Sequence, residues 1–576
     1  MPLNFPYRIF CALLLPFVLV EAQAAKQVPP NVVIVITDDQ GYGDIGAHGN
    51  PILKTPSLDK LHEESLRLTD FHVSPFCTPT RGAIMTGRYP GRNGAFRTSS
   101  GRTLMHTDES TMAEIFAANG YVTGLVGKWH LGDNAPHRPQ DRGFQQVVWH
   151  KAGGVGQGPD YWGNDYFDDT YEVASTDNKQ GTLKKFKGYC TDVWFDEAMR
   201  FVERNQEKPF FLYLSTNAPH GPYRVGKEWV APYSKVKGNS MKEFFGMIAN
   251  LDYNLGIFRA RLQQLGLAEN TIFIFMSDNG SAKGSGVYNA GMRGGKSTIW
   301  DGGHRVPFFF HWPEGKLAKP QNVNAMTAHI DVLPTLAELC GLDLPESYEA
   351  DGISFAKVLR KPKAPLKRDP IVVQFHGGVG LVKGIKPWDE SVVLSGKWRL
   401  MNGEKLYDIR KDPSQSKDVA KQFPEVVESL KPAYLSWWES VSPRMQAVRI
   451  DLGNPAQNPT DLNSQDWYLP KGNPPWSQGA IAGMPKKTGP WMVDVKQAGE
   501  YRFTLRQRPK EAPAALKAVR AKIEIAGVSQ EVDVAPGAKS VSFTLNLPAG
   551  PAELITYLYD TDDQVRGAYY TEVEAL

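Results

Sequence analysis

Cysteine is scarce in this chain, which excludes a fold held together by a disulfide framework. The 576 residues include four cysteines: Cys11, Cys77, Cys190 and Cys340. A single bridge between Cys190 and Cys340 is compatible with an oxidising compartment, but nothing in the sequence requires it. Cys11 lies in an N-terminal segment that we expect to be removed. Cys77 is then left without a partner, which suits a cysteine kept for chemistry.

The chain also lacks an excess of charge of either sign. Lys and Arg together number 65 and Asp and Glu 62, which gives a formal net charge of +3. This balance excludes a general polyanion-binding surface, so we expect no nucleic-acid partner, and anion recognition has to come from a local cluster. With 41% hydrophobic and 22% charged residues, a chain of this length is expected to form two or three globular domains.

Hydrophobic runs long enough to cross a membrane are missing too. The apolar run from Ile9 to Val20 is too short to span a bilayer, and no other stretch approaches that length. Arg8 precedes the run and the small-residue pattern Ala22-Gln23-Ala24 follows it, as in a secretory signal with its cleavage site. We therefore predict a signal peptide over residues 1–25 and an exported protein, periplasmic or secreted, with no stable membrane association.

Two apolar runs, Asn31–Ile36 and Thr271–Met276, are typical of strands buried on both faces of a sheet. Each is followed by side chains that carry oxygen atoms: Asp38, Asp39, Asp278 and Asn279. Ligands of an open α/β sheet bind outside the carboxyl ends of parallel strands, so the two runs can place four oxygen ligands at one edge. Taken alone, either cluster is equally compatible with a turn, because Asp, Asn and Gly favour turns for local reasons.

The segment Cys77-Thr78-Pro79-Thr80-Arg81, followed by Thr86-Gly87-Arg88, has the pattern of a helix start. Thr78 is suited to the N-cap position and Pro79 to the first helical position. Cys77 would then lie beside free N–H groups that favour negative charge, and Arg81 would return to the same face. A cysteine in such a pocket is a candidate for chemistry on an anion. The alternative is a buried structural cysteine.

Three more segments carry polar side chains next to predicted strands. In Gly127-Lys128-Trp129-His130-Leu131-Gly132, an extended backbone would point Lys128 and His130 to the same side, although a solvated strand end is the alternative. His220 follows the predicted strand Phe210–Ser215. Lys296 lies between glycines and Ser297 in the segment 293–307, where the alternative is a flexible surface lysine.

Together these segments resemble the signature of the type I sulfatases, which belong to the alkaline-phosphatase-like superfamily. The resemblance covers about residues 30–440 and rests on C-x-P-x-R followed by T-G-R, on G-K-W-H-L-G and on the segment around Lys296. It implies that a maturation enzyme oxidises Cys77 to formylglycine. It also implies a divalent-cation site, for which Ca²⁺ fits all-oxygen ligation and Mg²⁺ is also compatible, formed by Asp38, Asp39, Asp278, Asn279 and the modified Cys77.

The resemblance further implies a mechanism for the remaining residues. One hydroxyl of the hydrated formylglycine, activated by the metal and Asp278, attacks the ester sulfur, and the second then loses its proton to His130 so that sulfate is eliminated. Arg81, Lys128 and Lys296 offset the charge on the transferring group. The leaving alcohol is protonated by His220 or Lys296, and the sequence leaves that choice open.

We expect the substrate to be a sulfated carbohydrate, because the chain is similar to bacterial enzymes that act on algal galactans or glycosaminoglycans. An algal galactan such as carrageenan is the first candidate. Sugar-binding candidates are Lys128, His220, Lys296, His304, Trp149 and His150, with the loop His376-Gly377-Gly378 as a further segment that can reach the cleft or form a plain turn. For His304 the alternative is a satisfied histidine behind the pocket. Alternative functions are a phosphomonoester or phosphonate hydrolase of the same superfamily, or a non-catalytic glycan-binding relative.

The pattern of apolar and polar residues along the chain predicts three folded parts after the signal peptide. Residues 26–365 alternate buried strands with helices, which predicts an α/β domain with a large, mainly parallel sheet between helices. Residues 366–448 are expected to form a small antiparallel α+β subdomain. Residues 449–576 contain six segments with period-two alternation, which predict a β-sandwich-like appendage that either binds glycans or serves as a docking or stabilising module.

Overall fold

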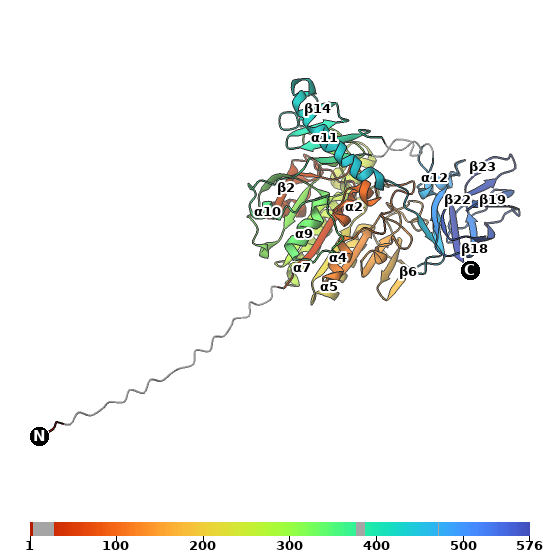
Figure 1. Cartoon of the computed structure of the whole chain (residues 1–576), viewed down its shortest axis with the longest axis horizontal. Helices are drawn as coiled ribbons and strands as arrows, with labels where there is room; N and C mark the ends of the chain where they lie inside the picture. The colour runs from red at the N-terminus through yellow and green to blue at the C-terminus, as the bar shows by residue number, and fades with distance from the viewer. Residues whose placement is uncertain (4–27, 376–385, 470–471) are drawn as a thin grey trace.

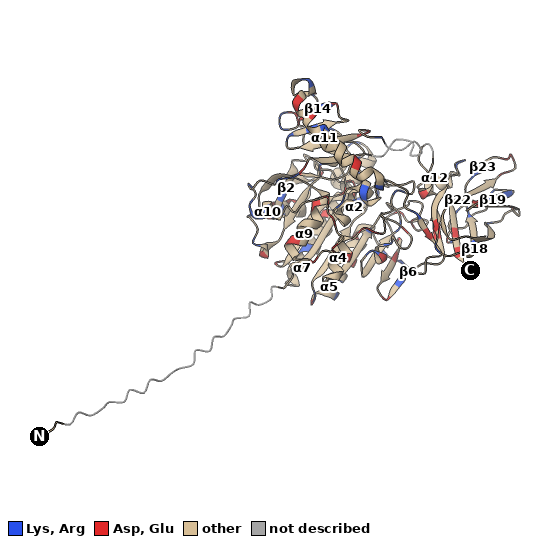
Figure 2. Ribbon diagram, viewed as in Figure 1, with Lys and Arg blue, Asp and Glu red and all other residues tan. Residues whose placement is uncertain are grey.

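The computed structural model describes residues 1–3, 28–375, 386–469 and 472–576. Figure 1 shows a large α/β body, a small sheet with helix α11 at the top of the view, and a C-terminal group of strands at the right. Lys and Arg are interspersed with Asp and Glu over all three parts (Figure 2), in keeping with the small net charge. The predicted signal peptide and the loop His376-Gly377-Gly378 fall largely or wholly outside the described residues.

A ten-stranded sheet forms the centre of the α/β body. Its order is β10-β2-β9-β8-β1-β7-β3-β4-β5-β6. The five central strands are parallel: β8 (Thr271–Ser277), β1 (Asn31–Thr37), β7 (Phe210–Ser215), β3 (Val122–Lys128) and β4 (Gln146–His150). Antiparallel pairings occur toward both edges, through β9 (Phe308–His311), β2 (Leu66–His72), β5 (Thr170–Ser175) and β6 (Asn178–Lys185). Strand β10 (Asn322–Ala328) lies at one edge and pairs with β2 in parallel. The predicted α/β class is confirmed, and the sheet is a mixed one with a parallel centre.

Strand β1 shows why the centre of the sheet is apolar throughout. Val32 and Ile34 belong to the core on one face, and Val33 and Val35 belong to the core on the other. Because successive side chains of a strand point to opposite faces, a strand covered on both sides must be apolar at every position. Helices cover one face with α4 (Met112–Ala118) and α9 (Val332–Cys340), and the other with α1 (Pro56–Glu64), α5 (Cys190–Asn205) and α7 (Asn239–Gln264).

The small subdomain is an antiparallel sheet of four strands, β11 (Ile371–Gln374), β12 (Ser391–Ser395), β13 (Trp398–Met401) and β14 (Lys405–Asp408). Helix α11 (Pro424–Val441) packs its Leu430 and Tyr434 against Val393 and Leu400 of this sheet. Arg399 of β13 is fully buried and donates from Nε to Asp301 Oδ1 at 2.9 Å and from Nη2 to Asp70 Oδ1 at 3.1 Å. These ion pairs fix the small sheet to the α/β body.

Two antiparallel-rich sheets make up the C-terminal part, with a shared core that includes Trp467, Trp491 and Phe503. The first contains β15 (Ile450–Leu452), β17 (Trp491–Val495), β22 (Gly550–Tyr559), β19 (Arg520–Ile525), β20 (Val528–Asp533) and β23 (Val565–Arg566). The second contains β16 (Thr460–Asn463), β24 (Tyr570–Ala575), β18 (Gly499–Arg506) and β21 (Ser540–Leu547). The six predicted strands are all present. The strands that the sequence did not reveal are β15, β16, β20 and β23.

One local prediction is wrong, and one bridge that the sequence left open is not formed. Helix α2 (Cys77–Thr86) already begins at Cys77, with Phe76 in the capping position, because the Thr78 hydroxyl donates to His130 O at 3.2 Å instead of capping the helix. Cys190 and Cys340 are both free. Cys190 belongs to the core on one face of the large sheet and Cys340 packs against the core on the other, so the sheet separates them. Among the described residues, no helix is long and apolar enough to cross a membrane.

Candidate active site

Strands β1 and β8 bring the predicted oxygen ligands together. The strands pair in parallel with Thr37 opposite Ser277, so Asp38 and Asp39 leave one strand beside Asp278 and Asn279 at the end of the other. Ligand atoms of Asp38, Asp39, Cys77 and Asp278 all lie within 4.8 Å of one another, and all four residues are buried. Asp39 has a left-handed backbone with φ of 72°, the kind of strain that occurs at functional sites.

The donor set fits a hard cation. Asn279 donates from Nδ2 to Asp39 Oδ1 at 2.8 Å, while its own Oδ1 is buried and accepts no hydrogen bond from any described residue. Such an orphaned acceptor beside three carboxylates is suited to oxygen ligation. Burial and the neighbouring Asp38 raise the pKa of Asp278 to about 6, because negative charges are crowded together in a buried site. A bound divalent cation would relieve this crowding.

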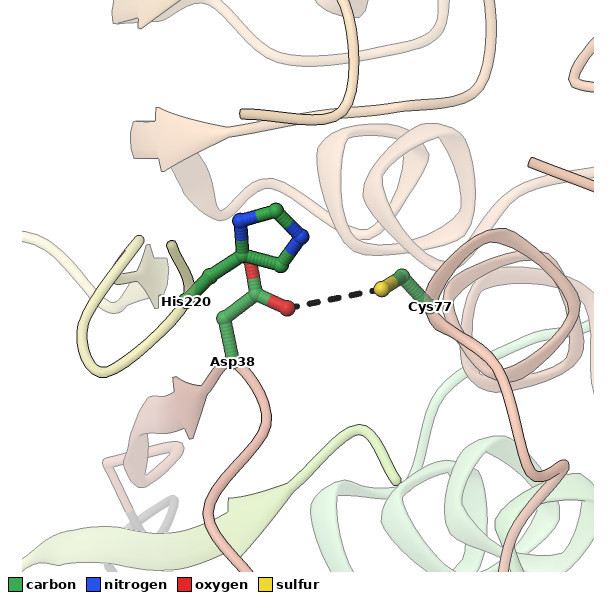
Figure 3. A group of neighbouring side chains, drawn as sticks. All are labelled: Asp38, Cys77 and His220. Atoms are coloured by element: carbon green, nitrogen blue, oxygen red, sulfur yellow. Dashed lines mark hydrogen bonds between the residues drawn. The ribbon is translucent and has the colours of Figure 1, made fainter. Parts of the chain in front are cut away.

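Cys77 begins helix α2 at the edge of this cluster. Its thiol donates to Asp38 Oδ1 at 3.4 Å (Figure 3), and Lys296 Nζ donates to Cys77 Sγ at 3.6 Å. Burial raises the pKa of the Cys77 thiol well above its ordinary value, despite the nearby Lys128 and Lys296. The thiolate is the nucleophilic form of cysteine, so the unmodified side chain is a poor nucleophile in this environment.

Two fully buried cations balance the carboxylates. Arg81 donates from Nη2 and Nε to Asp278 Oδ2 at 2.7 and 3.1 Å, and it also contacts the Ser215 hydroxyl. Lys128, the last residue of β3, donates to Asp38 Oδ2 at 2.7 Å. Because Arg81 lies one helical turn after Cys77, its return to the cysteine side of α2 follows the spacing that the sequence predicted.

Asp39 interacts with two more groups that line the opening of the site. Lys296 Nζ lies 2.5 Å from Asp39 Oδ1, and His220 Nε2 lies 3.9 Å from Asp39 Oδ2. Burial opposes ionisation of Asp39, but Lys296 and His220 outweigh it and lower the Asp39 pKa to about 2. Burial, together with the charge on Lys296, lowers the His220 pKa to about 4. His220 Nδ1 donates to Gly221 O at 2.6 Å, which leaves Nε2 turned toward the acidic cluster.

His130 lies beyond the end of β3 and has a left-handed backbone with φ of 61°. The extended geometry that would align it with Lys128 therefore stops at Lys128. His130 Nε2 lies 3.2 Å from Thr98 O and must carry the proton, since a carbonyl only accepts. The buried Nδ1 is then a lone-pair acceptor, and no described residue hydrogen-bonds to it. Burial and the charge on Lys128 lower the His130 pKa, which keeps the ring neutral with Nδ1 unprotonated.

A cavity of about 270 Å³ opens above Cys77, and four of the predicted catalytic residues line it: Cys77, His130, His220 and Lys296. Other lining residues were not predicted, among them Arg97, Thr98, Gln157, Asn473 and Trp476. Of these residues, Trp476 is the one that the sequence could have indicated, because it is an aromatic residue at the end of the proline-containing run Asn-Pro-Pro-Trp.

Three predicted substrate contacts lie elsewhere. Trp149 is fully buried in the core of the large sheet. His304 is buried with its Nδ1 3.0 Å from His72 Nδ1, in the cluster of Asp301 and Arg399 behind the site. His150 accepts a hydrogen bond from Asn217 and lines a different cavity, between the α/β body and the C-terminal strands. None of the three lines the cavity at Cys77. Packing and internal hydrogen bonds account for their positions.

Comparisons with known proteins agree with this geometry. A family model described as Sulfatase matches residues 30–342, and one described as N-sulphoglucosamine sulphohydrolase, C-terminal, matches residues 295–436. Arylsulfatase A from Homo sapiens is 30% identical over 459 residues, which are 70% of this chain and 86% of that protein. N-acetylgalactosamine-6-sulfatase from Rattus norvegicus is 30% identical over 355 residues, which are 57% of this chain and 66% of that protein.

A similar fold is present in the crystal structure of Ps i-CgsB in complex with k-i-k-neocarrahexaose. That structure superposes with a TM-score of 0.65 and 29% sequence identity, and the match covers 73% of this chain and 95% of that one. Both family models end before the C-terminal strands. The described site therefore lies within the matched region, except for the wall that Asn473 and Trp476 supply.

Proposed function

Because the chain belongs to the sulfatase family, whose members are sulfuric ester hydrolases, we propose that it removes sulfate esters from a sulfated polysaccharide or oligosaccharide. The observation that carries this proposal is the convergence of Cys77, His130, His220 and Lys296 on one cavity, above a buried cluster of carboxylates. Anionic and cationic groups in such a preorganised site can stabilise charge that develops on a transferring group. An algal galactan such as carrageenan is the first substrate that we propose.

We propose that two groups complete the site. Asp38, Asp39, Asp278 and Asn279 would hold a divalent cation, with Ca²⁺ favoured by the all-oxygen donor set. Cys77 would be oxidised to formylglycine by a maturation enzyme of the exporting cell, which agrees with the weak nucleophilicity of the buried thiol. When present, these groups supply a hydroxyl nucleophile and a Lewis acid that polarises the sulfate ester.

The other residues of the site would then bind the sulfate group, balance the charge of the carboxylates and take up a proton. Lys128 and Arg81 hold Asp38 and Asp278 in place and offset their charge. Lys296, within 3.6 Å of Cys77 Sγ, is placed to bind the sulfate group that reacts there. His130 is placed to take up a proton at its free Nδ1.

We assign protonation of the leaving alcohol to His220. Its ring is part-exposed in the cavity, whereas Lys296 is occupied by Asp39 and faces the nucleophile. For this task His220 Nε2 must first be protonated, because a pKa of about 4 leaves the ring neutral at pH 7. The assignment gives Lys296 and His220 separate tasks, one on the sulfate group and one on the alcohol.

The test of the proposed function is sulfate release from a panel of carrageenans, agar-type galactans, fucoidan, ulvan, chondroitin and heparin. The assay uses protein that contains formylglycine, beside the Cys77→Ala variant. We expect release from a galactan by the first protein and none by the variant. Sulfate release from a glycosaminoglycan alone would contradict the galactan assignment. If conversion of Cys77 is verified and no sulfate is released from any polymer or its oligosaccharides, the proposed function is overturned.

A further inference from the structure

A loop of the C-terminal part, residues 472–476, reaches the active-site cavity, although it lies outside both segments that match the sulfatase family models. Asn473 and Trp476 line the same cavity as Cys77, His130 and Lys296. We propose that Trp476 is a specificity-determining residue, whose indole forms a stacking platform for the sugar ring next to the sulfated one. This inference rests on the proposed function and adds a subsite to it.

The indole of Trp476 is available to a ligand. Its exposed fraction is 43%, which is unusual for a large aromatic side chain. The preceding Pro474 and Pro475 limit the backbone freedom of the segment. Besides the active-site cavity, Trp476 lines a second groove with Pro485 and Lys487. The ring thus stands at the border between the sulfate-binding cavity and an adjoining surface, where a chain of sugars leaving the cavity would continue.

The backbone of this segment is held firmly against the α/β body. Trp476 O accepts from Gly158 N at 2.8 Å, and Ser477 forms a β-bridge with Gln157. Gln478 donates from its side chain to Gln157 O at 3.2 Å and to Tyr161 O at 3.1 Å. Because these bonds fix the segment before a ligand arrives, little ordering is required when a sugar stacks on the indole.

The segment between β16 and β17 also contacts the loop around Thr98 at the cavity. Asn473 Oδ1 accepts from Arg97 Nη2 at 2.7 Å, and Tyr468 donates from its hydroxyl to Gly101 O at 2.9 Å. This loop carries Thr98, whose carbonyl oxygen accepts a hydrogen bond from His130 Nε2. The C-terminal part therefore contributes a loop to the wall of the cavity, which agrees with a role in substrate selection rather than in stabilisation alone.

Aromatic side chains combine a large apolar face with a low entropic cost of ordering, and a sugar presents a matching apolar C–H face. The platform contacts only substrates that extend beyond the sulfated sugar. A small aryl sulfate would fill the sulfate-binding part of the cavity and leave Trp476 untouched. The proposal therefore separates two kinds of substrate.

The experiment compares kcat/KM of Trp476→Ala with that of the unchanged protein on a sulfated carrageenan hexasaccharide and on nitrophenyl sulfate. We expect a loss of about tenfold on the hexasaccharide and less than about twofold on the aryl sulfate. Trp476→Phe should recover most of the loss. The control is Tyr253→Ala, which removes an exposed aromatic side chain of α7 outside the cavity and should change neither rate.

Equal losses of kcat/KM on both substrates, or an unchanged kcat/KM on the hexasaccharide, would contradict the proposal that Trp476 is a stacking platform. Calorimetry in the Cys77→Ala background gives a second measurement that needs no turnover. There, Trp476→Ala should weaken the affinity for the hexasaccharide by a similar factor, and an unchanged Kd would count against the proposal. If the unchanged protein hydrolyses neither substrate, the proposed function fails, and the calorimetric result still decides whether Trp476 binds the sugar.

Discussion

Lys296 and His220 lie beside the same carboxylate, and we assign them different roles. Lys296 lies 2.5 Å from Asp39 and within 3.6 Å of Cys77 Sγ, whereas His220 is 3.9 Å from Asp39 and faces the opening of the cavity. The sequence predicted both residues for the site, because Lys296 lies in a segment that resembles the sulfatase family and the resemblance implies a role for His220. It could not separate their roles, since these depend on distances to a residue far away in the chain.

His220→Ala should reduce hydrolysis of a sulfated sugar far more than hydrolysis of nitrophenyl sulfate. The sugar alkoxide is a poor leaving group that needs a proton, whereas nitrophenolate leaves without one, and general acid catalysis contributes about 10²- to 10⁴-fold. Lys296→Ala should reduce both rates alike, because it contacts the group common to both substrates. Steady-state kinetics on the two substrates checks this, and a reversed pattern would exchange the two roles.

At the scale of elements, buried strands were the easiest features to predict. Strand β1 and strand β8 are apolar at every position because both faces are covered, and polar residues begin where the sheet ends. The turn after β3 was harder. The extended backbone considered for this segment ends before His130, whose backbone is left-handed. His130 contacts Thr98 through its ring and the start of α2 through its carbonyl oxygen. Such contacts leave no periodic trace in the sequence.

Arg399→Leu tests the connection between the small sheet and the α/β body. Removal of this fully buried guanidinium leaves Asp301 and Asp70 without their cation, and loss of one partner from a buried ion pair costs about 3–5 kcal/mol. We expect a clear fall in the thermal midpoint of unfolding, measured by scanning calorimetry. Arg502→Leu, which breaks an exposed pair with Glu574, is the matched control and should change it little. Equal effects of both variants would contradict this account.

At the scale of the whole molecule, the C-terminal strands were predictable as strands but not as part of the site. The alternation of apolar and polar residues in these strands indicates that one face of each sheet is buried, as Phe503 and Leu505 of β18 illustrate. It carries no information about which surface of the α/β body they cover. The contact between Arg97 and Asn473 joins residues 376 positions apart, and only the folded chain brings them together.

The interface between the C-terminal strands and the α/β body is predicted to be pH-dependent. Burial and the neighbouring Asp133 raise the pKa of Asp466 to about 7. An unfolded chain loses this proton near pH 4, roughly the ordinary value, while the folded chain keeps it, so stability falls as pH rises from about 4 to 7.

Asp466→Asn removes the titrating group and should therefore raise the thermal midpoint at pH 8 relative to the unchanged protein. The two proteins should unfold at more similar temperatures at pH 4, where Asp466 is protonated in the folded state and about half protonated in the unfolded chain. Scanning calorimetry at the two pH values measures the difference. A variant that is destabilised to the same extent at both would contradict a raised pKa at this position.

The central claim is that the cavity above Cys77 hydrolyses sulfate esters. The most direct test is turnover of nitrophenyl sulfate and nitrophenyl phosphate by protein that contains formylglycine, beside Cys77→Ala and Cys77→Ser. The account predicts multiple turnovers of the sulfate ester, slower hydrolysis of the phosphate ester, and loss of turnover in both variants with the fold intact. Faster hydrolysis of the phosphate ester, or full turnover by homogeneous Cys77→Ser, would contradict it.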